Sequence, residues 1–509
     1  MSKPKLGWVY LVGAGPGDPG LLTLRGAEIL KRAEVVVHDA LIDPAVLRMT
    51  QPGVEIIDAG KRRKEHTLTQ DQIHQLLRER AQAGKTVVRL KGGDPYIFGR
   101  GGEEAERLFE AGIPFEVVPG VSSFSAAAAA AGIPLTHRKY ASSFTVLTGH
   151  EDPTRPEAAI DWRHVAQAHG TKVVLMGLGQ IDQISRELVA GGMPTTTPVA
   201  LVRWGTTPSQ QTVAGTLETI STQAQQAQLT PPVLAVVGDV VQMRPHLNWF
   251  ERRPLFGKRV VVTRSRDQAP EFALRLRELG ADVLEIPTIR IVPPTDRQSM
   301  VECLASLGEY DWIVFTSANG VTAFFEALHA AFEDIRAVGN VRFAAVGPAT
   351  AARLRDLRLR VDATPEQFVG KAIVKAIQSQ ESLDNLRILL ARAQSANPEL
   401  CQELEDHGAI VDDVAFYQTV PETADPEGAA ERLTLEGADW ITFTSGSTVE
   451  HFHDRFDLPR LVAKHPHLRL ASIGPETSKV IRQLKLEPSV EASPHTTDGL
   501  IHSLQRPKT

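Results

Sequence analysis

The sequence predicts an α/β fold of several lobes, and three observations lead to that prediction. Short β-branched stretches alternate with segments whose apolar residues recur at helical spacing. Glycine-rich runs follow these stretches where strands would end. The second half also contains the same pair of segments twice. A chain of 509 residues is too long for one core, and about 150 residues per domain suggests three or four compact units.

In the first half, we expect strands at residues 9–15, 34–41, 171–179 and 232–241, and a helix over residues 21–33. The glycine loops thin out after His137. We therefore divide the half into lobes of about 1–140 and 141–248, with a pocket between them.

Four glycine-bearing runs mark the first lobe. They are VGAGPGD at 12–18, VVRLKGGDPYIFGRGGEE at 87–104, VPGVSSFSAA at 118–127 and GIPLTHR at 132–138. Glycine recurs where a chain turns tightly or lies against a ligand. We expect all four runs at strand ends, where they would build the pocket of a small-molecule enzyme.

Residues 249–256 form a predicted linker, because charged residues and Pro254 separate the first half from a fresh strand at 258–263. In the second half, residues 311–328 and 342–361 are repeated as 439–452 and 469–487. Each FTS (315–317, 443–445) and each GPxT (347–350, 474–477) should end a strand and open a helix. The Ser or Thr can cap that helix, and the free N–H groups can bind an anion. One interpretation is that these motifs only cap helices. The other is that four of them face one cleft and together bind a polyanion.

Composition narrows the class of protein. Hydrophobic residues make up 42% and charged residues 23% of the chain, as in ordinary globular proteins. No apolar run reaches the roughly 18–20 residues of a membrane span, and the polar start MSKPKLGW is too short for a secretory signal. The isolated Cys303 and Cys401 argue against a disulfide framework or cysteine-based metal site. We expect a cytoplasmic protein without metal, and the net charge of −6 does not favour nucleic acid.

A nicotinamide site is the first alternative for the loop GAGPGD. Its third glycine comes early, Pro16 and Pro19 disturb the start of a helix, and no acidic residue follows at the expected place. We therefore expect no NAD, although a nicotinamide-dependent oxidoreductase stays as an alternative for this half.

Over residues 6–248 the sequence resembles the tetrapyrrole methyltransferases, most closely the uroporphyrinogen-III C-methyltransferases. VGAGPGD, HDALI, AGKR, RLKGGDPYIFGRGGEE, VVPGVSS, GIPLTHR, TGH, MGL and ALVRWGT occur in the family's order. The resemblance implies a two-lobed fold and a site for S-adenosylmethionine. That site would use Pro16, Gly92, Gly93, Asp94, Ile97, Ser122, Ser123, Met176 and Gly205. Asp94 is otherwise a turn residue before Pro95, and Met176 otherwise packs in the core.

The resemblance also implies that Asp39 and Lys61 are an acid–base pair. A carboxylate is useful because a pyrrole that attacks a methyl group must lose a proton, whereas Lys61 can instead hold a substrate carboxylate. Either residue is otherwise a surface charge at a strand end. Uroporphyrinogen carries eight carboxylates, and we expect Arg100 and Arg138 to bind some of them.

Over residues 257–504 the sequence resembles the uroporphyrinogen-III synthases through VTRS, FTSANGV, AVGPATA, VAFYQTV, FTSGS and SIGPETS. The resemblance implies a bilobal α/β fold, with one lobe at about 291–418 and the other at about 257–290 plus 419–509. Tyr417 matches the family's functional tyrosine, although it can also serve packing. Substrate contacts are expected in the cleft from Ser317, Thr350, Ser445 and Thr477, and from Arg264 and Arg392 after strands.

Together the resemblances imply a bifunctional enzyme. Its second half would cyclise hydroxymethylbilane to uroporphyrinogen III, and its first half would methylate this product at C2 and C7 to precorrin-2, toward sirohaem or cobalamin. The resemblance to the methyltransferase family also implies a homodimer formed through the first half. The alternative is a methyltransferase whose second half binds tetrapyrroles without catalysis.

Overall fold

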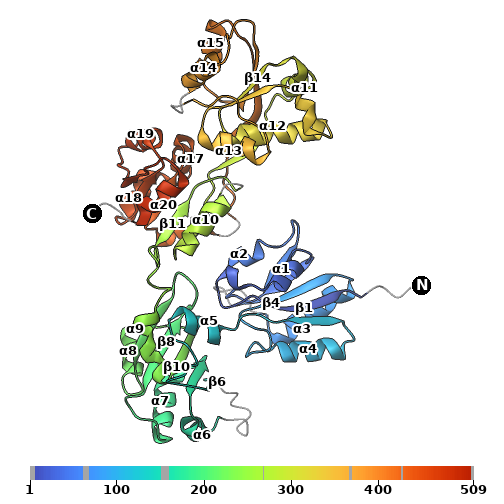
Figure 1. Ribbon diagram of the computed structural model, residues 1–509. Helices are drawn as coiled ribbons and strands as arrows, with labels where there is room; N and C mark the ends of the chain where they lie inside the picture. Colours follow the sequence, from blue (N-terminus) through green and yellow to red (C-terminus); the bar gives the residue numbers. More distant parts are fainter. Residues whose placement is uncertain are drawn as a thin grey trace, which may run out of the picture.

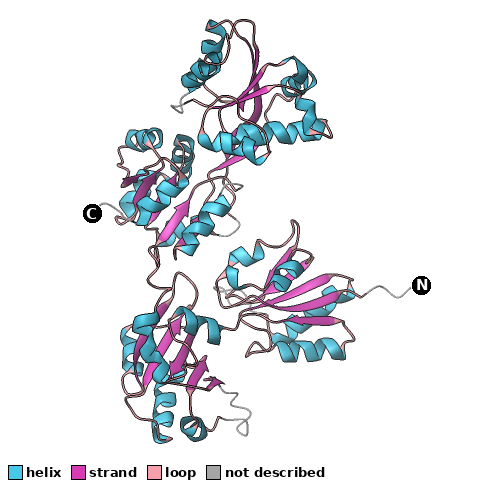
Figure 2. Cartoon of the chain, viewed as in Figure 1, coloured by secondary structure: helices cyan, strands magenta, loops and turns pink. Residues whose placement is uncertain are grey.

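The computed structural model describes residues 6–60, 68–150, 160–266, 269–365, 370–425 and 428–505. These residues form four five-stranded sheets, two in each half of the chain. Figure 1 shows the resulting four lobes, and Figure 2 shows that helices cover the sheets. The α/β class predicted from the sequence is confirmed. Within the described residues, no helix combines the length and apolar character needed to cross a membrane.

The first lobe, blue in Figure 1, contains a parallel sheet in the order β3-β2-β4-β1-β5. Its strands are β1 (Trp8–Gly13), β2 (Val35–His38), β3 (Glu55–Asp58), β4 (Thr86–Lys91) and β5 (Phe115–Val118). Its helices are η1 (Pro19–Leu21), α1 (Leu24–Leu30), α2 (Pro44–Leu47), α3 (Gln70–Gln82) and α4 (Gly101–Glu110). Helices cover both faces, which is why β2 is buried along its whole length.

The second lobe has a mixed sheet in the order β6-β7-β10-β8-β9. Its strands are β6 (Phe144–Thr148), β7 (Thr171–Leu175), β8 (Pro198–Arg203), β9 (Gln211–Thr216) and β10 (Val233–Val237). Its helices are α5 (Ser123–Ala130), α6 (Trp162–Gln167), η3 (Leu178–Gln180), α7 (Ile181–Ala190), α8 (Ile220–Gln226), η4 (Asp239–Met243) and α9 (Arg244–Leu247). Helix α5 packs in this lobe's core, against Val173 and Ala200, although the sequence analysis placed it with the first lobe.

One lobe of the second half combines two distant segments, lime and red in Figure 1, through the pairing of β11 with β18. Its parallel sheet has the order β12-β11-β18-β19-β20. The strands are β11 (Arg259–Val262), β12 (Asp282–Glu285), β18 (Trp440–Phe443), β19 (Arg469–Ser472) and β20 (Val490–Glu491). The helices are α10 (Ala269–Glu278), α16 (Ala429–Glu436), α17 (Gly446–Phe456), α18 (Leu458–Lys464), α19 (Pro475–Gln483) and α20 (Thr497–Gln505).

The other lobe of this half has the sheet order β13-β17-β16-β14-β15. Its strands are β13 (Ile289–Val292), β14 (Trp312–Phe315), β15 (Arg342–Ala345), β16 (Arg387–Ala393) and β17 (Ile410–Pro421). Its helices are α11 (Gln298–Ala305), η5 (Leu307–Glu309), α12 (Ala318–Ala331), η6 (Ile335–Val338), α13 (Pro348–Asp356), α14 (Gly370–Gln378) and α15 (Glu399–Asp406). Strands β13 and β17 pair antiparallel and carry the chain between the two lobes.

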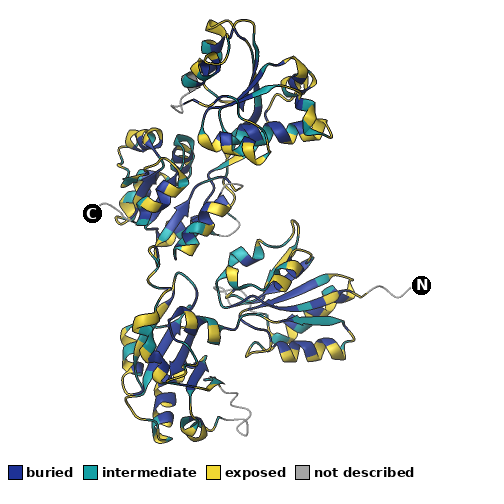
Figure 3. Ribbon diagram, viewed as in Figure 1, coloured by how far each residue is buried: buried dark blue, intermediate teal, exposed yellow. Residues whose placement is uncertain are grey.

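Burial follows the sheets. Figure 3 shows dark-blue strands inside each lobe and yellow helix faces outside. Most of the buried side chains in the strands are apolar, such as Val9, Val36 and Phe443. Strand β4 is an exception, because Arg89 and Lys91 are buried within it. Buried charges are costly unless they are paired, so we expect negatively charged partners next to Arg89 and Lys91.

Candidate active sites

Three glycine loops meet at one edge of the first sheet. Strands β4, β1 and β5 are parallel neighbours, so their carboxyl ends lie at the same edge. The loops at 13–18, 92–97 and 119–123 follow these three strands. Gly15 and Gly93 join the first two loops by exchanging backbone hydrogen bonds of 3.3 Å and 2.7 Å. The predicted meeting of these three loops is confirmed.

The glycines serve two purposes at this edge. A Cβ on Gly120 would lie 2.2 Å from the Gly93 oxygen, and one on Gly13 would lie 2.6 Å from the Gly120 Cα, so these residues let the loops pack together. Gly92 differs, because a Cβ there would meet no atom within 4 Å. The open backbone at Gly92 is therefore the position where a ligand can approach.

Asp94 ties the second loop to the third. One carboxylate oxygen accepts the Tyr96 N–H at 2.8 Å, and the other accepts the Gly120 N–H at 3.0 Å. The side chain is only 9% exposed. The interpretation of Asp94 as a turn residue agrees with the first contact, and the second shows that it also organises the pocket.

The second lobe closes this edge from the other side. The Asp18 N–H donates to the Thr206 hydroxyl at 3.3 Å. Gly205, the residue before Thr206, packs against Ala127 of α5 within the second lobe. Met176 follows β7 with 53% exposure and a φ of +57°, so it does not pack in the core.

The remaining predicted cofactor residues lie on these same loops. Pro16 is half-buried in the first loop, Ile97 is exposed in the second, buried Ser122 precedes α5, and Ser123 begins it.

The fourth glycine run is placed differently from the prediction. Residues 132–138 follow α5 rather than a strand, and Gly132 packs against the backbone of Leu247 and Asn248. Only three of the four runs therefore build the edge. Arg138, in this fourth run, is exposed. Arg100 is also exposed and forms an ion pair with Glu103 at 2.6 Å.

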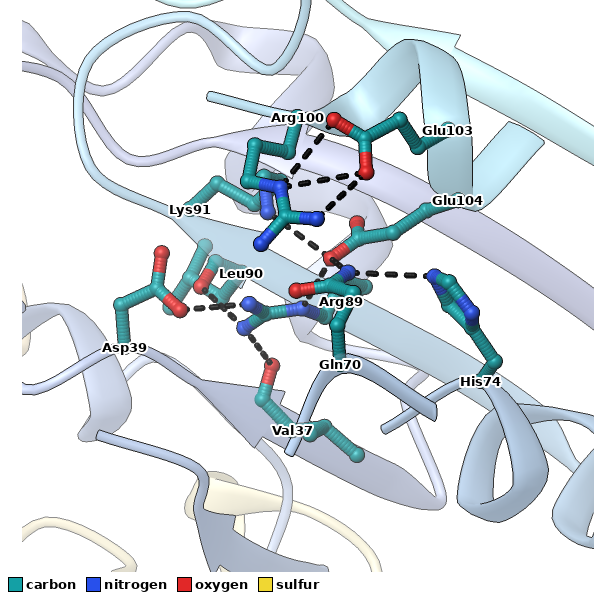
Figure 4. Close-up of polar contacts among 10 residues, drawn as sticks. All are labelled: Val37, Asp39, Gln70, His74, Arg89, Leu90, Lys91, Arg100, Glu103 and Glu104. Carbon is teal, nitrogen blue, oxygen red and sulfur yellow. Dashed lines mark hydrogen bonds and ion pairs between the residues drawn. The ribbon is translucent and has the colours of Figure 1, made fainter. Parts of the chain in front are cut away.

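Asp39 lies at the same carboxyl edge, directly after β2. Its backbone N–H donates to the Leu90 oxygen of β4 at 3.2 Å. Figure 4 shows its carboxylate bound by Arg89, with 2.5 Å between Nη2 and Oδ1. Arg89 is buried, whereas the Asp39 side chain is 36% exposed. A rigid, buried guanidinium therefore fixes a carboxylate that solvent and ligands can reach.

Arg89 belongs to a buried charge network centred on Glu104 of α4. The Glu104 carboxylate is 0% exposed, and its Oε1 accepts Arg89 Nε at 3.1 Å, Lys91 Nζ at 2.9 Å and Gln70 Nε2 at 3.1 Å. Burial and the neighbouring Arg89 lower the pKa of Lys91, while Glu104 opposes this shift.

The sequence analysis assigned no role to Arg89, Lys91 or Glu104. The sequence did contain a sign of this network, because two charged residues interrupt the apolar stretch VVRLK. Lys61, the predicted partner of Asp39, lies outside the described residues.

Tyr417 and Ser317 come together where β17 crosses between the two lobes of the second half. Their hydroxyl oxygens are 2.9 Å apart, and the Ser317 oxygen also accepts the Gly320 N–H at 3.0 Å. Tyr417 is 7% exposed, and burial raises its pKa. The prediction that placed both residues in one site agrees with this contact.

The repeated motifs open helices as predicted, but their caps differ. Ser317 caps α12 and Ser445 caps α17, each through its side chain. At the GPxT motifs, Gly347 and Gly474 are the cap residues of α13 and α19. Thr350 and Thr477 lie inside the first turn with 3% exposure. The prediction that these threonines cap the two helices is therefore wrong. The proline that follows each glycine is suited to the first helical position.

The two predicted arginines have different surroundings. Arg392 forms a buried fork with both oxygens of Asp413, 2.6 Å from Nε to Oδ1, and donates to the Asn397 carbonyl at 2.6 Å. Its guanidinium therefore binds a carboxylate of the protein itself. Arg264 is partly buried after β11, and burial lowers its pKa. Within the described residues, no three His, Cys, Asp or Glu side chains are grouped to hold a metal.

Comparisons with known proteins match both halves. The family described as Tetrapyrrole (Corrin/Porphyrin) Methylases matches residues 8–221, and the family described as Uroporphyrinogen-III synthase HemD matches residues 270–502. The porphyrin biosynthesis protein HemD of Ruminiclostridium josui is 36% identical over 98% of this chain and 97% of its own length. The uroporphyrinogen-III C-methyltransferase of Bacillus subtilis is 43% identical over 65% of this chain and 68% of its own.

Among solved structures, the uroporphyrin-III C-methyl transferase of Thermus thermophilus, complexed with S-adenyl homocysteine, is 43% identical with a TM-score of 0.40. It aligns over 46% of this chain and 99% of its own.

The two family matches and the two relatives define a bifunctional enzyme of tetrapyrrole biosynthesis. The chain belongs to the tetrapyrrole methylase family through its first half and to the uroporphyrinogen-III synthase family through its second.

Proposed function

We propose that the second half cyclises hydroxymethylbilane to uroporphyrinogen III and the first half methylates this product at C2 and C7 to precorrin-2. The observation that carries the proposal is the carboxyl edge of the first sheet. There Asp39, held by buried Arg89, shares one edge with three interlocked glycine loops. Family membership supports the same assignment for both halves.

S-adenosylmethionine is the proposed methyl donor, and when bound it supplies an electrophilic methyl group. The residues present suit it. Gly92 offers open backbone, while Ile97 and Met176 offer exposed apolar surface. Asp94 keeps the second and third loops together, and Thr206 holds the first loop to the second lobe. These residues would orient the donor, and alignment of reacting groups supplies much of the rate in a displacement.

Asp39 is the proposed proton acceptor. A pyrrole ring attacks through its β-carbon and must then lose the proton on its nitrogen. Among the described residues, Arg89 contacts the Asp39 carboxylate through Oδ1. Arg89 itself is held by the Val37 and Leu90 carbonyls and by Glu104. This arrangement would hold Oδ2 in position to take the proton.

Tyr417 is the proposed acid of the synthase. Burial raises its pKa, so the phenol stays protonated near neutral pH. It could donate its proton to the hydroxyl that leaves the bilane as water. The helices that begin at Ser317, Gly347, Ser445 and Gly474 would present free N–H groups toward substrate carboxylates. Ring closure then depends mainly on how the bilane is folded.

The proposal also includes a cytoplasmic location and no resident metal, both expected from the composition, and a homodimer through the first half, which the family resemblance implies. Light scattering of the purified chain tests the dimer, and a mass near 111 kDa, twice the 55.5 kDa of one chain, is expected.

The test of the function is to incubate the full chain with hydroxymethylbilane and S-adenosylmethionine and identify the product by mass and absorbance. We expect a product with two added methyl groups from the wild type. Asp39→Asn should accumulate uroporphyrinogen III, because only the second step loses its base. If the wild type binds hydroxymethylbilane without forming the type III isomer, the second half is a binding module and the synthase assignment is wrong.

A further inference from the structure

Two cavities lie between the methyltransferase half and the synthase half. The first has a volume of about 600 Å³ and the second about 660 Å³. Both fall within the roughly 300–1,000 Å³ of small-molecule sites. They are contiguous, because they share a wall made of Asp18, Pro19, Arg48, Arg253, Arg277 and Glu285. We call this joint space the interdomain chamber.

The chamber borders the first candidate site and extends along the second half of the chain. At one end it is lined by Gly17 of the first glycine loop, by Ala40, which follows Asp39, and by Thr206 of the second lobe. At the other end it is lined by Arg266 and Ala424. Ala424 comes shortly after β17, the strand that carries Tyr417, and the Arg266 guanidinium donates to its carbonyl at 3.4 Å.

Guanidinium groups line the shared wall. Arg48 from the first half and Arg277 from the second both contact one oxygen of Glu285, at 3.2 Å and 2.6 Å. One carboxylate thus faces two cations. Arg253 lies over the rings of Trp249 and Phe250 at 4.7 Å and 4.6 Å. Arg48 and Arg277 remain about a third exposed, at 36% and 31%, and can be reached by a ligand.

We propose that the interdomain chamber is an additional binding site for an octacarboxylate tetrapyrrole macrocycle, which it holds between cyclisation and methylation. The inference rests on the proposed function for the identity of the ligand. Arginine forks match carboxylates in two-point contacts. Ring stacking by Arg253 keeps its guanidinium plane fixed, which reduces the entropy lost when a carboxylate binds. Substrate carboxylates would exchange with Glu285 on the same cations.

The first test measures binding without turnover. Uroporphyrin III, the stable oxidised octacarboxylate, is titrated into the full chain while porphyrin fluorescence is followed. We expect Arg277→Ala to lose one equivalent of bound porphyrin per chain. Arg275→Ala is the matched control, because it lies on the same helix but pairs with Asp498 outside the chamber. Arg253→Ala removes a wall cation that has no carboxylate partner among the described residues, and it should lower affinity at least several-fold.

Unchanged stoichiometry and affinity in both Arg277→Ala and Arg253→Ala would overturn the proposal. Loss of binding in Arg275→Ala as well would also overturn it, since that result indicates a general change of the helix. If the wild type catalyses neither reaction but binds porphyrin through Arg277, the proposed function is wrong and the proposed binding site is supported.

The second test follows transfer between the halves. Labelled hydroxymethylbilane and S-adenosylmethionine are supplied with a tenfold excess of unlabelled uroporphyrinogen III. Free mixing predicts that roughly one part in eleven of the methylated product carries label. The wild type should exceed this value several-fold, and Arg277→Ala should fall to it. Wild-type label at the free-mixing value would contradict holding between the steps.

Discussion

Glu104 neutralises the buried cations beneath Asp39. Its carboxylate has no exposed surface and faces both Arg89 and Lys91. Its second oxygen, Oε2, has no hydrogen-bond partner within the described residues. Removing one partner of a buried ion pair is far more harmful than removing a surface pair, because an uncompensated charge stays behind. The position of Asp39 therefore depends on a residue that never meets the substrate.

We predict that Glu104→Gln destabilises the first lobe by about 3–5 kcal/mol. Amide hydrogen exchange of peptides covering β4, followed by mass spectrometry, measures this locally. Glu103→Gln is the matched control, because its neighbouring carboxylate is half exposed and pairs with exposed Arg100. That change should cost no more than about 1 kcal/mol. Equal protection of β4 in the two variants would show that the network carries little stability.

Tyr417 contributes one hydroxyl to a well-defined contact. We predict that Tyr417→Phe lowers kcat for cyclisation at least tenfold, because the proton donor is lost while the ring remains. The hydrogen bond to Ser317 contributes only about 1 kcal/mol, so the lobe should stay folded. Methylation of added uroporphyrinogen III should be unchanged. Cyclisation at the wild-type rate would mean that Tyr417 serves packing alone.

At the scale of elements, parallel strand ends explain the first site. Strands β2, β4, β1 and β5 deliver Asp39 and three loops to one edge because all four run in the same direction. Strand β17 has a similar role in the second half. It pairs parallel with β16 and antiparallel with β13, so it brings Tyr417 to the crossing between lobes.

The glycine loops supply a prediction at this scale. Gly92→Ala should leave the fold intact, because its Cβ meets no atom within 4 Å. It should weaken S-adenosylhomocysteine binding about tenfold, or about 1.4 kcal/mol, by filling the open backbone surface. Calorimetry measures this value. Gly120→Ala places its Cβ 2.2 Å from the Gly93 oxygen, so it should disturb the loops and lower thermal stability. Full affinity in Gly92→Ala would place the donor elsewhere.

At the scale of the whole molecule, two families on one chain keep consecutive reactions close together. The halves also contact each other directly, since Arg48 reaches Glu285 across the interdomain chamber. Burial raises the pKa of Asp43, which lines the first cavity near Arg277 and Arg48. Proximity raises the local concentration of product at the next site.

A mixture of Asp39→Asn and Tyr417→Phe chains tests this arrangement. Each variant alone should form little precorrin-2, and the mixture should form it only after a lag. The rate should be at most about half that of the wild type, because half of the chains carry each working site and the intermediate must cross between molecules. Product mass over time measures the effect. A mixture as fast as the wild type, without a lag, would show that fusion gives no kinetic advantage.

The sequence predicted many of the strands and helix starts, because strands, helix starts and glycine turns depend on neighbouring residues. The chemical roles of the site residues stay predictions. The sequence also predicted the α/β class and the duplication. It placed Tyr417 and Ser317 at one cleft, and their hydrogen bond is a finding of the structure. It failed where contacts join distant segments. The run at 132–138 looked like a strand-end loop, but α5 carries it into the second lobe.

By itself, therefore, the sequence determined the order of strands, the glycine loops, the repeated helix starts and the two families. Only the tertiary structure decided that Glu104 lies beneath Arg89 and Lys91, that Gly13 and Gly120 pack against each other while Gly92 stays open, and that arginines of both halves face one chamber. Local pattern specifies a turn or a strand through short-range sterics. Burial and ion pairing depend on which distant surfaces the fold brings together, and no single segment contains that information.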